Sequence, residues 1–389
     1  MEADTPLISD QEFAARLAQA SELISERNLD IFLVNSTEAD FANVRYFSDY
    51  WTLFEIAGVA ISPAGDAALL IGPESETYAR DRSKIDRIHK MVEYRESADP
   101  AYPGVLVSTF KEVFSELGVP QPRRIGIGGY LVTTAPVLDS LREAFPDAEI
   151  VRADDIMVKM RGIKSPAELA CLQRAFEISE SAVEAVLDVI KPGMTELQVV
   201  GTAERVIYER GGEYEGHPQY VLSGRNSTHA ISRPTHRIMQ RGDLVQLNIG
   251  ARVSGYSSSV GLPICLGKMT DHMRDLVEFG LEAHAKTIEW LKKDVIAANV
   301  ANQYRQLFID RKYDAYFLYG PCHGLGMQEV EPPWMEETSD YMLAENMTFQ
   351  VDTFLYDKEF GLRWENGTKI IDGGNELFSG KYRRVIERS

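Results

Sequence analysis

The stretch "DLVQLNIGARVSGYSSSVG", residues 243–261, predicts a β-hairpin at the centre of the fold. Apolar and polar side chains alternate on both sides of Ser254–Gly255, a dipeptide typical of a tight hairpin turn. Asn248 lies on the first strand and Ser259 on the second. Whether chemistry takes place at these two polar positions is a question for the rest of the chain.

Strong helix signals precede the hairpin. Ser165, Pro166 and Glu168 in "MRGIKSPAELACLQRA" form an N-cap, a proline in the first turn and a capping box. "KPGMTELQVVGTAERVIYERGG" repeats this arrangement with Thr195 and Gln198. A rougher copy near 295–311 is a weak sign that this part of the chain consists of two related halves.

Residues 1–157 alternate helical and strand patterns. They include an amphipathic helix over 10–29, a short buried strand over 30–36 and two strands joined by a Pro-Ala-Gly-Asp turn over 58–72. A length of 389 residues also favours two domains. We therefore expect an α/β (α+β) protein with a mixed N-terminal domain at 1–157 and a second domain at 158–389.

The composition excludes several classes of partner. The net charge of -18 repels nucleic acid and anionic membrane surfaces. "MEADTPLISDQEF" has neither a basic start nor an apolar run, and no stretch approaches the length of a membrane span. The three cysteines are far apart and fit neither a disulfide framework nor a zinc site, so a cytoplasmic protein is expected.

The order of several motifs is more specific than any one of them. These are "MRGIKSPAELACLQRA", "KPGMTELQV", "SGRNS", "RGDLVQLNIG", "SGYSSS", "HGLGMQEVEPP" and "RWEN". Together they resemble the pita-bread family of creatinase, prolidase and aminopeptidase P, and "NVRYFSDYW" resembles the N-terminal domain of creatinase-type chains. The resemblance implies a creatinase-type N-terminal domain followed by a pita-bread domain, and it covers nearly the whole chain.

The peptidase branch of this family implies five ligands for two divalent metal ions. Carried over by motif, they fall on Asn248, Ser259, His323, Asp352 and Glu365, of which the first two are aspartates in that branch. Two neutral side chains leave too little negative charge for two divalent ions, so we expect no dinuclear centre. His323, Asp352 and Glu365 could still hold one manganese, zinc or iron ion.

The creatinase branch also lacks the metal aspartates, and it implies a metal-free hydrolysis that uses a histidine and glutamates. Here the histidine position falls on Ile231 and the glutamate positions on Gly261 and Asp352. Because the chain is extended before Pro234, His229 could share a face with Ile231 and present its imidazole to the pocket. A second histidine of the peptidase branch falls on Val330.

These considerations assign roles to nine side chains. The expected catalytic residues are His323, Asp352, Glu365 and His229. The expected substrate-binding residues are Asn248, Ser259, His217, Trp51 and Glu55. The last two are candidates because, in creatinase-like dimers, the N-terminal domain of one chain covers the pocket of the other. Glycines beside His323 permit close approach of a ligand, and Asp352 within an apolar strand needs a partner.

The sequence therefore predicts a homodimeric hydrolase that cleaves a C–N bond in a small amide- or amidine-type substrate without a metal cofactor. One alternative is a metal-dependent Xaa-Pro aminopeptidase or proline dipeptidase with a reduced, single-metal site. Another is a catalytically inactive pita-bread protein that binds a small ligand. The sequence does not identify the substrate.

Overall fold

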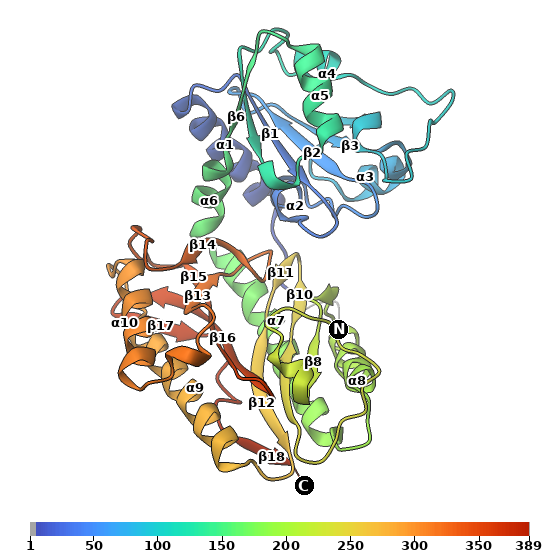
Figure 1. Ribbon diagram of the computed structural model, residues 1–389. Helices are drawn as coiled ribbons and strands as arrows, with labels where there is room; N and C mark the ends of the chain where they lie inside the picture. Colours follow the sequence, from blue (N-terminus) through green and yellow to red (C-terminus); the bar gives the residue numbers. More distant parts are fainter. Residues whose placement is uncertain (1–4, 389) are drawn as a thin grey trace. The chain divides into compact units, whose positions relative to one another are not determined.

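The computed structural model describes residues 5–388, which divide into two compact units (Figure 1). One comprises residues 8–161, and the other comprises residues 162–388 together with residues 5–7. The division lies four residues beyond the predicted boundary at 157, because helix α6 (Asp154–Gly162) is bound to the first unit. The hydroxyl of Tyr46 donates to the carbonyl of Met160, and Arg161 donates to the side chain of Asn43. Residues 1–4 of the predicted first domain lie outside the described residues.

The first unit is a six-stranded mixed sheet in the order β4-β3-β2-β1-β5-β6 with helices packed on it (Figure 1). Its strands are β1 (Ile31–Ser36), β2 (Ala57–Ile61), β3 (Ala67–Ile71), β4 (Ile88–Lys90), β5 (Arg124–Gly128) and β6 (Glu149–Arg152). Its other helices are α1 (Asp10–Glu26), α2 (Ala42–Ser48), α3 (Glu76–Arg82), α4 (Phe110–Glu116) and α5 (Ala135–Ala144), with short 3-10 turns at Pro73–Ser75, Val92–Tyr94 and Tyr130–Val132.

The core of this unit follows from its apolar strands. Every residue of β1 is buried, and the predicted hairpin is the antiparallel pair β2 and β3. Phe110, Phe114 and Phe145 pack beneath the sheet, where the rings of Phe114 and Phe145 stack 5.1 Å apart.

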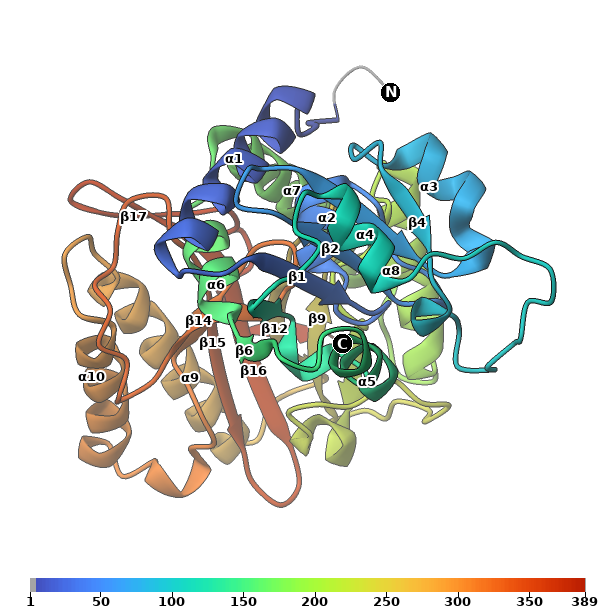
Figure 2. The same cartoon turned by 90° about the horizontal axis from the view of Figure 1, so that it is seen from above.

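The second unit contains four long helices. They are α7 (Pro166–Val189), α8 (Glu196–Glu209), α9 (Asp271–Trp290) and α10 (Ala297–Asp310). Both predicted capping boxes are present, one between Ser165 and Glu168 and one between Thr195 and Gln198. Short 3-10 turns lie at Gly224–Thr228 and Asp314–Tyr316. Helix α7 packs on α8, and α9 packs on strands of the large sheet. Helices α9 and α10 lie side by side (Figure 2).

A curved nine-stranded sheet forms the wall on which the site is built. Its path runs β14-β13-β15-β16-β12-β9-β8, with β17 paired to β16 and β18 paired to β12. The strands are β8 (Tyr220–Ser223), β9 (Leu244–Ile249), β12 (Val260–Leu266), β13 (Cys322–Gly324), β14 (Glu331–Met335), β15 (Thr348–Tyr356), β16 (Gly361–Ile371), β17 (Gly374–Leu377) and β18 (Ile386–Arg388). A small second sheet contains β7 (Tyr214–Glu215), β10 (Ala251–Val253) and β11 (Tyr256–Ser257).

The hairpin predicted for residues 243–261 is formed by β9 and β10 on one side and β11 and β12 on the other. Ser254 and Gly255 both have positive φ angles, of 48° and 89°, as a tight turn of the hairpin type requires. The register places Gly261 opposite Asn248, and Gly261 also faces Glu365 on β16. Three strands therefore bring these positions together at the centre of the sheet.

Two further observations concern the described residues as a whole. None of their helices combines the length and the hydropathy needed to cross a membrane. All three cysteines are buried and free of disulfide bonds.

Candidate functional site

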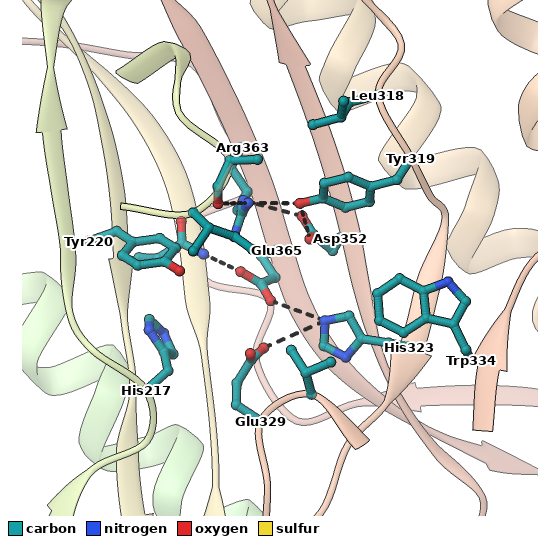
Figure 3. Close-up of a pocket in the computed structure, with 14 residues that line it drawn as sticks. His217, Tyr220, Leu318, Tyr319, His323, Glu329, Trp334, Asp352, Arg363 and Glu365 are labelled. Atoms are coloured by element: carbon teal, nitrogen blue, oxygen red, sulfur yellow. Dashed lines mark hydrogen bonds and ion pairs between the residues drawn. The ribbon is translucent and has the colours of Figure 1, made fainter. Parts of the chain in front are cut away.

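A cavity of about 390 Å³ lies within the second unit, against the strands of the large sheet. Figure 3 shows the labelled side chains converging on this space from several strands and loops. The lining residues are His217, Tyr220, Ala230, Ile231, Asn248, Leu318, Tyr319, His323, Glu329, Val330, Trp334, Asp352, Arg363 and Glu365.

Three groups that can bind a metal ion meet on one wall of the cavity. Nε2 of His323 lies 3.7 Å from Oε1 of Glu329 and 4.0 Å from Oε1 of Glu365. One donor atom from each residue lies within 4.8 Å of the others. Nδ1 of His323 faces the carbonyl of Gly324 at 3.0 Å and donates to it, which directs the lone pair of Nε2 toward the two acids.

Asp352 lies opposite Glu365 across β15 and β16 but is engaged elsewhere. The hydroxyl of Tyr319 donates to Oδ2 of Asp352 at 2.7 Å, and Nε of Arg363 lies 3.4 Å from Oδ1 (Figure 3). Asp352 thus has a hydrogen-bond donor and a cation as partners, and it is not one of the three donors that lie within 4.8 Å of one another. The cluster differs from the expected set of His323, Asp352 and Glu365 in having Glu329 in place of Asp352.

Asn248 and Ser259 both contact Glu365 from the hairpin. The amide nitrogen of Asn248 donates to Oε2 of Glu365, and the hydroxyl of Ser259 lies 3.1 Å from the same oxygen. A side chain at Gly261 would not leave room for this arrangement, because a Cβ there would lie 2.6 Å from Cβ of Glu365. The two predicted substrate-binding residues therefore lie at the site, but their polar atoms are directed at Glu365, and Ser259 does not line the cavity.

His217, expected to bind substrate, lines the cavity. Nδ1 donates to the carbonyl of Pro218 at 2.7 Å, and Nε2 lies 3.0 Å from the hydroxyl of Ser259. Burial is the main reason that the pKa of His217 is lowered to about 4, so the imidazole is neutral at physiological pH.

The two glutamates of the cluster perturb each other. Burial, followed by the charges of Glu329 and Asp352, raises the pKa of Glu365 well above its usual range. Burial also raises the pKa of Glu329 to about 7, although its hydrogen bond with Glu365 opposes this shift. Without a bound cation the pair therefore tends to retain a proton.

The structure places His229 outside the lining of the cavity. His229 ends the 3-10 turn at Gly224–Thr228 and is exposed, whereas Ala230 and Ile231 line the cavity. The backbone of His229 is extended, as predicted, with φ -86° and ψ 121°. The geometry does not support the catalytic role expected for His229, because the residue is exposed and is not among those that line the cavity.

Trp51 and Glu55 belong to the first unit, where both have local partners. Trp51 packs against the ring of Phe41 and lies 4.9 Å from the guanidinium of Arg45. Glu55 is buried and accepts hydrogen bonds from the hydroxyl of Ser75 at 2.5 Å and the amide of Glu74 at 3.1 Å. These contacts give Glu55 a structural role, and the role of both residues in a dimer lid stays a prediction.

Glu329 is the site residue that the sequence analysis missed. It stands two residues before Glu331 in "HGLGMQEVEPP", and both acids precede the prolines. Glu331 forms a buried ion pair with Lys164 at 2.9 Å, which leaves Glu329 as the acid that faces His323. The sequence shows two acids, Glu329 and Glu331, two residues apart. Which of them belongs to the site becomes clear only from the ion pair between Lys164 and Glu331.

Comparison with known families now places the chain. The model for metallopeptidase family M24 matches residues 170–370, and that for the creatinase/prolidase N-terminal domain matches residues 16–163. The chain belongs to family M24. Its first unit is a creatinase-type N-terminal domain and its second unit has the pita-bread fold, as the resemblance implied.

Individual relatives cover the chain almost completely. A Xaa-Pro dipeptidase of Pyrococcus furiosus is 26% identical over 373 residues, which are 95% of this chain and 99% of the relative. An uncharacterised peptidase of Bacillus subtilis, YqhT, is 25% identical with the same coverage. A prolidase structure from Thermococcus sibiricus has a TM-score of 0.84 at 19% identity, and it covers 96% of this chain and 99% of that one. This M24 chain is therefore a hydrolase of C–N bonds.

Family M24 implies a divalent metal, and the cluster of His323, Glu329 and Glu365 fits one ion. One imidazole nitrogen and two carboxylates, buried and within 4.8 Å of one another, are a donor set that manganese, zinc and iron accept. Within the described residues, neutral Asn248 and Ser259 add no charge for a second ion. The expectation of a metal-free site has no support from the family or from this cluster.

Proposed function

We propose that this M24 chain hydrolyses a C–N bond of a small substrate with one divalent metal ion, held by His323, Glu329 and Glu365. One observation carries the proposal: the donor atoms of these three residues converge within 4.8 Å on the wall of a cavity of about 390 Å³. A cavity of this volume accommodates a molecule about the size of a dipeptide.

A divalent ion in such a site polarises a carbonyl oxygen and lowers the pKa of water. The residues of the chain supply the orientation. Arg363 is fixed by hydrogen bonds to the carbonyl of Ala230 and the hydroxyl of Tyr319, both at 2.7 Å, and by its ion pair with Asp352. A guanidinium held in this way is suited to binding a carbonyl or carboxylate oxygen of the substrate.

The proposed substrate class is a dipeptide with proline as its second residue. Support comes from relatives named Xaa-Pro dipeptidase that match nearly the whole chain. In this proposal Arg363 binds the carboxylate of the dipeptide, and Trp334, which stacks on His323 with ring centres 5.5 Å apart, forms part of the wall beside the scissile bond.

A metal-free reaction of the creatinase type is the second candidate. One observation favours it. Neutral Asn248 and Ser259 occupy the two hairpin positions at which the resemblance to the peptidase branch implies metal-binding aspartates. In that case the carboxyl pair of Glu329 and Glu365 would supply the acid and the base, since their pKa values are raised by burial.

Metal analysis and turnover distinguish the candidates. Protein purified without chelator should hold one equivalent of manganese, zinc or iron, and removing the ion should abolish hydrolysis of Leu-Pro, with recovery on adding metal back. Glu329→Gln should lose both the ion and the activity, while Glu337→Gln, at an exposed position, should keep both. Full activity in metal-free protein would favour the creatinase-type reaction. Binding of dipeptides without turnover under any condition would indicate an inactive ligand-binding protein.

We also propose that the chain is a cytoplasmic homodimer. The three cysteines lie far apart in the sequence, as is common in proteins of a reducing compartment, and the creatinase-like resemblance implies a dimer. Sedimentation equilibrium would test the dimer, and a sedimenting mass near 43.7 kDa would refute it.

A further inference from the structure

A chain of hydrogen bonds lies behind the wall of the cavity and ends on Glu365. His217 contacts Ser259 through Nε2 at 3.0 Å, and the hydroxyl of Ser259 lies 3.1 Å from Oε2 of Glu365. Asn248 donates to the same Oε2 and lies 3.4 Å from the hydroxyl of Ser259. Ser259 is fully buried and does not line the cavity, so it links His217 to Glu365 and does not act on the substrate.

The position of the His217 ring is set by its surroundings. Nδ1 donates to the carbonyl of Pro218 at 2.7 Å, which fixes Nε2 toward Ser259. The ring lies over Gly250, where a Cβ would come within 2.8 Å of Cδ2 of His217. A Cβ there would also lie 2.2 Å from the carbonyl oxygen of Ser258, so a glycine at this position permits both the close backbone approach within the hairpin and the position of the His217 ring.

These contacts give the two carboxylate oxygens of Glu365 different partners. Oε1 faces His323 at 4.0 Å, on the side of the cluster with Glu329. Oε2 accepts from the amide nitrogen of Asn248, which also donates to the hydroxyl oxygen of Ser259 at 3.4 Å, while Ser259 gives its one proton to Nε2 of His217. A glutamate that bridges two ions needs both oxygens for metal, so the hydrogen bonds leave only one oxygen for this purpose.

We infer that His217 is a positioning residue of the metal site: through Ser259 and Asn248 it fixes Glu365 so that one oxygen serves a single ion and the place of a second ion is closed. This inference rests on the proposed function, because it assumes that His323, Glu329 and Glu365 bind an ion. It goes beyond that function because it states that the orientation of Glu365 depends on His217, a residue that binds neither metal nor substrate.

The experiment compares metal affinity in matched variants. His217→Phe keeps a ring but cannot bond Ser259, His217→Gln keeps a hydrogen-bonding group, and Ser259→Ala removes the link with little change in volume. His229→Phe, at an exposed histidine outside the cavity lining, is the control. The dissociation constants for Mn²⁺ and Zn²⁺ are measured by competition with a chelating dye, and the number of bound ions by elemental analysis.

The inference predicts that H217F and S259A bind the ion roughly 10- to 100-fold more weakly, the usual effect of removing a group that orients a ligand. H217Q should stay within a fewfold of the wild type, H229F should be unchanged, and kcat should fall more than KM rises in H217F. The inference is overturned if folded S259A binds the ion as tightly as the wild type, or if H217Q is impaired as much as H217F. It is also overturned if the wild type binds two ions. If E329Q loses the ion while S259A retains it, the role assigned to His217 is refuted but the proposed function stands. If the wild type binds no ion, the proposed function is refuted as well.

Discussion

Replacing Asn248 and Ser259 together by aspartate should convert a site for one ion into a site for two. Both side chains contact Oε2 of Glu365, so two new carboxylates would stand beside the existing cluster of His323, Glu329 and Glu365. Without metal these carboxylates repel Glu365. With metal they supply the two negative charges that a second divalent ion requires.

The distances set the size of the effect. Ser259 Oγ lies 3.1 Å from Oε2 of Glu365. A carboxylate oxygen at about that separation repels ionised Glu365 by about 5 kcal/mol at an effective dielectric constant of about 20, and by less while the glutamate pair retains a proton. The double variant should therefore unfold below the wild type in chelator at pH 8, by up to roughly 10 °C. Metal at about 1,000 times its dissociation constant returns about 4 kcal/mol, which restores most of the loss.

Thermal unfolding with and without Mn²⁺, combined with elemental analysis, measures both effects. The wild type should bind one ion per chain and the double variant two, and the metal-induced rise in Tm should be larger in the double variant. The single variant Asn248→Asp should lie between them. If the double variant were as stable as the wild type in chelator, or still bound only one ion, the argument that missing negative charge limits the metal content would be refuted.

Three further predictions concern other residues. Because burial raises the pKa of Glu329 from 4.5 to about 7, this group stabilises the metal-free fold below pH 4.5 and loses that contribution as the pH rises through 7. Glu329→Gln should thus gain up to about 3 kcal/mol at pH 8 in chelator relative to the wild type, but not at pH 4.5, as measured by urea unfolding. His229→Ala should leave kcat and KM for Leu-Pro within twofold of the wild-type values, and a large loss of activity would show that His229 takes part in the reaction. Lys164→Met should destabilise the second unit by about 3–5 kcal/mol, because it leaves Glu331 buried without its cation, and an unchanged urea midpoint would contradict this.

Local rules were sufficient for much of the fold. The capping boxes at Ser165 and Thr195 depend only on residues three positions apart, and both helices begin where those residues indicate. The turn at Ser254–Gly255 is equally local. In contrast, α9 (Asp271–Trp290) was not recognised. Its apolar face is interrupted by buried His284, whose partner Asn366 lies 82 residues away, so the reason for a histidine there is not visible in the local pattern.

The site shows where local rules end. Glu329, Glu331 and Asp352 all lie in or beside apolar segments, and each needs a partner that neutralises it. Lys164 forms an ion pair with Glu331, and Arg363 lies beside Asp352. Glu329 is the acid of the three that faces His323. Family motifs pointed to His323 and Glu365 of the cluster but not to Glu329, since ion pairing between distant segments decides which acid faces the histidine.

The charge of the cavity argues for one ion independently of how Glu365 is held. Among the described residues that line it, Asp352, Glu329 and Glu365 are acids and Arg363 is the one group with a permanent positive charge, since burial keeps His217 neutral. The ionised cavity therefore carries two excess negative charges, which a single divalent ion balances. A second ion would leave two uncompensated positive charges in a largely buried space, at a cost of several kcal/mol. Neutral Asn248 and Ser259 add no counter-charge for a second ion, which agrees with the proposed site for one ion.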